Sequence, residues 1–115
     1  MTYEYDPIHS IIHLRASGKL VADDPIQYFK AIDNDPSFRA PSEERIYFTE
    51  LKDIQFSFTD IINIRDAFES HSHGDKISHG IFIVDSDFSL GMANMVINIF
   101  EGVFDEFTIQ RIDEA

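Results

Sequence analysis

The stretch from residue 78 to residue 104 constrains the fold more than any other part of this chain. It starts with a nearly continuous apolar run, His79–Val84, which is typical of a strand covered on both faces. A short polar turn follows, in which Ser89 can cap a helix that we expect to run to about Phe104. A strand, a turn and a helix in this order predict an α/β domain.

The rest of the chain adds strands and helices in alternation. Pro7 divides a first strand region over 3–15, because proline cannot donate to a central ladder, and Ser17-Gly18 predicts a turn after it. Asp24-Pro25 predicts a helix start, with Asp24 as the cap. The later elements that we expect are a strand over Arg45–Leu51, a helix over Asp60–Ser70 and an edge strand over Phe107–Ile112. The order β-β-α-β-α-β-α-β implies parallel strand pairs with right-handed crossovers.

Composition and charge narrow the classes of function. The 115 residues suit one domain, and a hydrophobic fraction of 43% excludes disorder. Without cysteine the chain can form neither a disulfide nor a thiolate, so we expect a cytoplasmic location. The chain contains no run of about 18 or more apolar residues, so we expect no membrane span. The formal net charge of -12 argues against nucleic acid as a partner, and it leaves solubility or a basic protein partner as interpretations.

Several local signatures, in a fixed order, resemble those of a known family. They are Gly18-Lys19-Leu20, Asp35-Pro36-Ser37-Phe38, the strand, loop and helix of 47–64, Phe88-Ser89-Leu90-Gly91-Met92-Ala93, and a closing strand that ends near Glu114-Ala115. With them the chain resembles the STAS-like domains, in particular the SpoIIAA-like (STAS/SEC14-type) family of small bacterial proteins. The resemblance covers nearly the whole chain. It implies one STAS-like domain over 1–115, a mixed, mostly parallel sheet with helices packed against it, and binding rather than turnover.

The resemblance also points to a phosphoswitch at the start of one helix. In anti-sigma-factor antagonists of this type, a partner kinase phosphorylates a serine in an Asp-Ser-Ser-Gly motif. The corresponding stretch here reads Phe58-Thr59-Asp60-Ile61, without the serine pair or the glycine. Ser57 and Thr59 are the nearest hydroxyls, and Asp60 could stand in that position as a permanent negative charge. The alternative is that Thr59 or Ser57 only caps the helix that follows.

A group of histidines suggests a different chemistry. His71, His73, Asp75 and His79 are residue types that bind zinc, and they fall within a short span. The alternative is an exposed polar turn. A metal-dependent enzyme is therefore one hypothesis, although the chain has no nucleophile elbow and no glycine-rich phosphate loop, and we expect no cofactor.

The last helix carries more apolar surface than a helix packed on one side needs. The residues that widen its apolar arc, or line it, are Met92, Met95, Val96, Ile97, Phe100 and Phe104. Three interpretations stay open: a neighbouring loop or the last strand covers the arc, a second copy of the chain covers it, or it lines a pocket for a lipid-like ligand. We expect a non-catalytic regulatory or protein-binding module that forms a homodimer through the last helix. The alternative is a carrier or sensor of a small apolar ligand held between that helix and the sheet.

Overall fold

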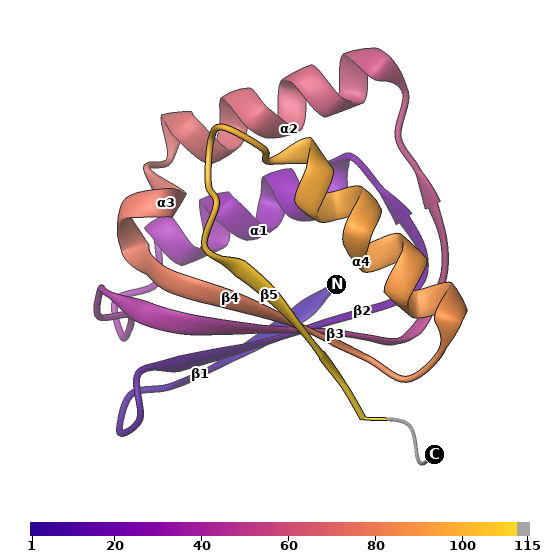
Figure 1. The fold of residues 1–115 in the computed structure, drawn as a ribbon. Helices are drawn as coiled ribbons and strands as arrows, with labels where there is room; N and C mark the ends of the chain where they lie inside the picture. The colour runs from indigo at the N-terminus through magenta and orange to yellow at the C-terminus, as the bar shows by residue number, and fades with distance from the viewer. Residues whose placement is uncertain (113–115) are drawn as a thin grey trace.

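In the computed structural model, which describes residues 1–112, five strands form one sheet and the long helices lie on one side of it (Figure 1). The expected end of the last strand at Glu114-Ala115 lies outside the described residues. The elements in chain order are β1 (Thr2–Asp6), β2 (Ile11–Val21), α1 (Asp23–Asp33), β3 (Ser42–Gln55), α2 (Phe58–Ser70), α3 (His73–Lys76), β4 (Ile77–Val84), α4 (Asp87–Ile99) and β5 (Phe107–Arg111).

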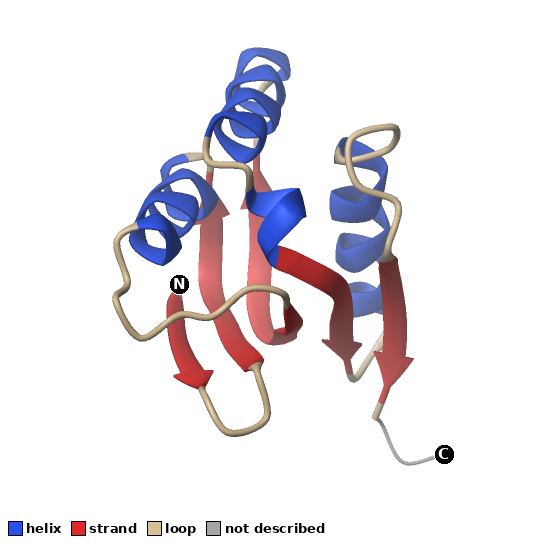
Figure 2. Cartoon of the chain, turned by 90° about the vertical axis from the view of Figure 1, so that its left-hand side faces the viewer, coloured by secondary structure: helices blue, strands red, loops and turns tan. Residues whose placement is uncertain are grey.

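The strands lie in the sheet in the same order as in the sequence, β1 to β5, with the first and last strands at opposite edges (Figure 2). β1 pairs with β2 in an antiparallel manner, and each later strand is parallel to the one before it. Because every right-handed crossover steps in the same direction, all of them place their helices on the same face. The predicted α/β class and mixed, mostly parallel sheet are confirmed, with the short helix α3 as an addition.

Period-two alternation along the strands builds the core between the sheet and the helices. In β2, for example, Ile12 and Leu14 are buried and their neighbours are not. The helices meet this face with Phe29, Ile64 and Phe68, among others. The inward-facing core residues of the three central strands are Ile12, Leu14, Ala16, Leu20, Ile46, Phe48, Leu51, Ile77, Phe82 and Val84.

β2 and β3 are longer than expected, and their pairing is irregular. Ser17-Gly18 does not form a turn but lies within β2, where Gly18 has a φ of +66° that its lack of a side chain permits. Between the pairs Arg15↔Tyr47 and Ser17↔Glu50, β3 contains one residue more than β2. This is a β-bulge, which lets the two strands continue through a segment that resembles a turn in sequence.

Helix boundaries also differ from expectation at both ends. α2 begins at Phe58 rather than at Asp60, and its N-cap is Ser57, one of the two candidate caps. α4 has Ser86 as its N-cap, and Ser89 lies three residues into the motif as the second half of a capping box. α4 ends at Ile99 rather than near residue 104. In α1, Asp24 does not cap the helix, and its carboxylate instead accepts a hydrogen bond from the Val21 N–H.

Candidate functional sites

The sheet has one face that no helix of the described residues covers, and we call it the open face. Its side chains alternate with the core residues and form rows across the strands, such as Arg15, Tyr47 and Ile83. Its residues are Thr2, Glu4, Asp6, Ile11, His13, Arg15, Glu43, Arg45, Tyr47, Thr49, His79, Ile81, Ile83, Thr108 and Gln110. It is thus a broad surface on a mostly parallel sheet, a type of sheet that is usually buried on both faces.

The centre of the open face is apolar. Ile11, Tyr47 and Ile81 are half-buried, and Ile83 is only 6% exposed although no helix within residues 1–112 lies over it. The sequence of β4 predicted a strand covered on both faces, whereas the described chain covers one. Ile81 and Ile83 therefore occupy positions that are usually polar in a strand with one face exposed to solvent.

Polar side chains surround this centre in an ordered arrangement. The Arg15 guanidinium lies 4.2 Å from the centroid of the Tyr47 ring. The Tyr47 hydroxyl and His13 Nδ1 are 2.9 Å apart and share a hydrogen bond. Glu43 pairs with Arg45 and, at 2.9 Å, with His79 Nε2. The face therefore offers charges of both signs around an apolar patch.

A second candidate site lies in the interior, where Glu44, Tyr28 and His73 form a buried polar cluster. Glu44 Oε2 accepts a short hydrogen bond from the Tyr28 hydroxyl and is 2.9 Å from His73 Nε2. The exposed fractions are 4%, 5% and 1% for Glu44, Tyr28 and His73. Burial, and then the neighbouring Glu44, raise the pKa of Tyr28 well above its ordinary value.

Aromatic rings enclose His73 on several sides. Its ring centroid lies 4.8 Å from that of Phe29 and 5.3 Å from those of Tyr28 and Phe68. Its Nδ1 atom has no hydrogen-bond partner among the described residues. The cluster therefore contains one buried polar atom without a partner, which lowers its contribution to stability.

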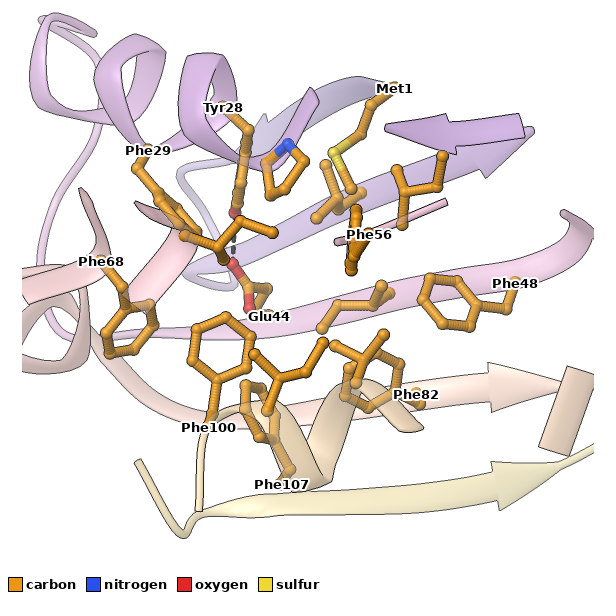
Figure 3. Close-up of a pocket in the computed structure, with 17 residues that line it drawn as sticks. Met1, Tyr28, Phe29, Glu44, Phe48, Phe56, Phe68, Phe82, Phe100 and Phe107 are labelled. Carbon is orange, nitrogen blue, oxygen red and sulfur yellow. Dashed lines mark hydrogen bonds between the residues drawn. The ribbon is translucent and has the colours of Figure 1, made fainter. Parts of the chain in front are cut away.

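A small apolar cavity adjoins Glu44 (Figure 3). Figure 3 shows Glu44 and Tyr28 pointing toward one another, with phenylalanine rings around them. The cavity lies between the sheet and the helices, with Val96 and Phe100 on its α4 side, and its volume is about 50 Å³. An engineered cavity of about 150 Å³ holds one benzene molecule, so this cavity is too small for a lipid chain.

The residues singled out around the last helix are mostly covered by the chain itself. Met92, Phe100 and Phe104 are buried, Val96 and Ile97 are partly buried, and Met95 is 48% exposed. Beyond the end of α4 the chain turns back, and the rings of Phe100 and Phe104 lie 4.9 and 5.8 Å from that of Phe68. Their rings also pack on Phe107 of β5. A neighbouring loop and the last strand thus cover most of the apolar arc.

The structure does not bring the predicted metal ligands together. His71 pairs with Asp33, His73 with Glu44 and His79 with Glu43, while Asp75 is exposed. Within residues 1–112, no group of three or more His, Cys, Asp or Glu side chains could hold a metal ion.

The phosphoswitch candidates form the N-terminus of α2. Ser57 Oγ accepts the Asp60 N–H at 3.0 Å, and the Asp60 carboxylate accepts the Ser57 N–H at 2.9 Å. Thr59 is exposed and takes no part in this capping box. Ser57 and Asp60 therefore hold each other in a helix-capping role.

Sequence reasoning missed Glu44, although a signal was present. Glu44, Ile46 and Phe48 alternate in one strand, which places the carboxyl group on the core side. The predicted strand begins only at Arg45, which leaves Glu44 outside it. Its partners Tyr28 and His73 are 16 and 29 residues away, a distance that no local pattern covers.

No protein-family model matches this sequence, and comparisons with curated proteins and with solved structures give no match. The resemblance to STAS-like domains therefore stays a prediction. In the part of the chain that the structure describes, no helix is long and apolar enough to cross a membrane.

Proposed function

We propose that this protein is a non-catalytic regulatory or protein-binding module that associates with a second copy of itself through the open face. The observation that carries the proposal is the β4 strand, in which Ile81 and Ile83 face away from the helices. Exposure of a parallel sheet to water on one face is unusual. Burial of these side chains against a partner would remove their apolar surface from water, and this would favour association.

Charge favours the open face over the rest of the surface. The face carries three acidic residues, Glu4, Asp6 and Glu43, and two arginines, Arg15 and Arg45, which gives a net charge of -1 against -12 for the chain. Two copies repel one another least when these faces meet.

The distribution of the charges also suits a second copy. Asp6 and Glu43 lie toward one end of β2 and β3, and Arg15 lies toward the other. A two-fold axis across the strands would place the acidic end of one copy opposite the Arg15 end of the other. The five strands are 5 to 14 residues long. With about 4.8 Å between strands and 3.3 Å per residue, they cover roughly 700 Å² in plan. With side-chain relief this approaches the ~800 Å² per partner of a standard interface.

The test is the oligomeric state of matched variants, measured by sedimentation equilibrium or light scattering. We expect the unmodified chain to show twice the monomer mass at about 100 μM, and Ile81→Arg to weaken association tenfold or more. The matched control is Met95→Arg, which adds the same charge to the exposed side of α4. A monomeric wild-type chain would contradict self-association. A monomeric Met95→Arg beside a dimeric Ile81→Arg would return the interface to the last helix.

A second candidate function is binding of a small apolar molecule in the cavity beside Glu44. The supporting observation is the cavity itself, which lies between α4 and the sheet where such a ligand was expected. Its volume of about 50 Å³ limits the ligand to a few heavy atoms unless α4 moves. Native mass spectrometry of the purified chain tests this idea. A bound small molecule that is lost in the cavity-filling variant Val96→Phe supports it, and a chain without adduct contradicts it.

Cytoplasmic location and the absence of catalysis, which the sequence suggests, belong to the same proposal. The lack of cysteine supports the cytoplasmic location.

A further inference from the structure

We propose that a pocket at one end of the open face, centred on Arg15, binds a small monocarboxylate. The pocket has a volume of about 170 Å³. It is lined by Met1, Thr2, Arg15, Ala16, Ser17, Tyr47, Thr49 and Glu50. Arg15 and Tyr47 also belong to the open face, in one row with Ile83. The test therefore includes a variant that is expected not to self-associate.

Arg15 is positioned to receive an anion. Its guanidinium stacks on the Tyr47 ring with 4.2 Å between Cζ and the ring centroid, and His13 holds the Tyr47 hydroxyl. Stacking uses the flat face of the guanidinium and leaves its N–H edges available for a bidentate contact with a carboxylate. Among residues 1–112, no carboxylate pairs with Arg15.

The β-bulge supplies the remaining donors. Thr2 on β1 and Tyr47 on β3 lie opposite Arg15 in the sheet. The extra residue of β3 shifts the register between Arg15 and Ser17, so the consecutive residues Thr49 and Glu50 both border the pocket. Bulges commonly redirect side chains at binding sites. The hydroxyls of Thr2, Ser17 and Thr49 can donate to the same anion.

Charge and size define the class of ligand. Glu50 borders the pocket and the chain as a whole is acidic, so a second negative charge on the ligand is disfavoured. Among the side chains that line the pocket, Arg15 is the cation and Glu50 the anion, which matches one carboxylate rather than a phosphate dianion. The volume of about 170 Å³ is close to that of a cavity that holds benzene. An organic acid of roughly six carbons or fewer, with its chain beside Tyr47, fits these limits.

The experiment is an NMR titration of the full chain with butyrate, followed at the backbone amides. Butanol and inorganic phosphate serve as comparison probes, because the first lacks the charge and the second carries more of it. We expect saturable shifts at Arg15, Ser17 and Thr49 with butyrate, and at least tenfold weaker binding in Arg15→Gln. Thr49→Val, which keeps the arginine, should weaken binding severalfold. The matched control is Arg39→Gln, which removes an exposed arginine elsewhere.

The same titration in Ile81→Arg separates this proposal from the proposed self-association. Retained binding in that variant supports an independent site, whatever the oligomeric state. The proposal is overturned by the absence of saturation at about 50 mM butyrate. It is equally overturned by unchanged binding in Arg15→Gln, or by equal shifts with butanol or phosphate.

Discussion

Replacement of Tyr28 by phenylalanine removes one hydroxyl group from the interior and keeps the ring. The hydroxyl donates to Glu44, which then retains only the contact with His73. Near neutral pH we expect Tyr28→Phe to lower the free energy of unfolding by about 1–3 kcal/mol, the usual cost of leaving a buried acceptor with one partner fewer. The aromatic contacts of the ring with Tyr3 and Phe29 should persist.

The deficit should shrink at high pH. In the unfolded chain a tyrosine releases its proton near pH 10, whereas burial and Glu44 raise the pKa of Tyr28 in the folded chain. Above pH 10 the unfolded state therefore binds fewer protons than the folded state, and wild-type stability falls by about 1.4 kcal/mol per pH unit from this group. Phenylalanine has no such term, so the stabilities of the two proteins should converge.

Urea unfolding followed by circular dichroism between pH 8 and pH 11 measures this convergence. Groups other than Tyr28 titrate in both proteins and cancel in the difference. At pH 8 the control Tyr5→Phe should cost clearly less, because the Tyr5 hydroxyl bonds to the Arg39 backbone at an exposed site. Ser42 Oγ, which is 3.4 Å from that hydroxyl, keeps its hydrogen bond to the Arg39 carbonyl. A difference between wild type and Tyr28→Phe that stays constant from pH 9 to pH 11 would show that the buried phenol does not behave as described.

Two further predictions concern backbone and caps. Gly80→Ala should destabilise the fold by about 1–3 kcal/mol, because a Cβ there would lie 2.6 Å from the Phe107 ring. Gly91 lies on α4 with open space around it, so Gly91→Ala should be neutral or should stabilise the fold by up to about 1 kcal/mol. Thermal melts of both variants check this, and equal effects would refute it. Ser57→Ala should cost about 1 kcal/mol through loss of the capping box, and Thr59→Ala should change stability by less than about 0.5 kcal/mol. Urea midpoints that rank the two variants in the opposite order would contradict this assignment.

The order of strands and helices was predictable because hydrophobic period reports local structure directly. The alternation of Ile12 and Leu14 with their neighbours, and the continuous run before Asp85, each identify a strand without knowledge of its partners. Boundaries were less predictable. Gly18 resembles a turn in sequence, and only its pairing with β3 shows that the strand continues.

The candidate sites depend on contacts that no local pattern contains. The wide apolar arc was predicted for a helix that continues to Phe104. The helix ends at Ile99, and Phe104 packs back on Phe68. His71, His73 and His79 are close in sequence, yet each pairs with a different carboxylate in the fold. Those carboxylates are Asp33, Glu44 and Glu43. The open face follows from the direction of each crossover, which sequence alone does not state.

The sequential order of the strands has a consequence for how the chain acquires its structure. From β2 to β5, each strand pairs with the strand made immediately before it. During synthesis a new strand would meet a finished template edge and would not need to insert between two earlier strands. Each pairing then closes only the loop of its own crossover, which limits the entropic cost of forming a parallel sheet. We expect assembly of this sheet to proceed as growth from one edge, one unit at a time.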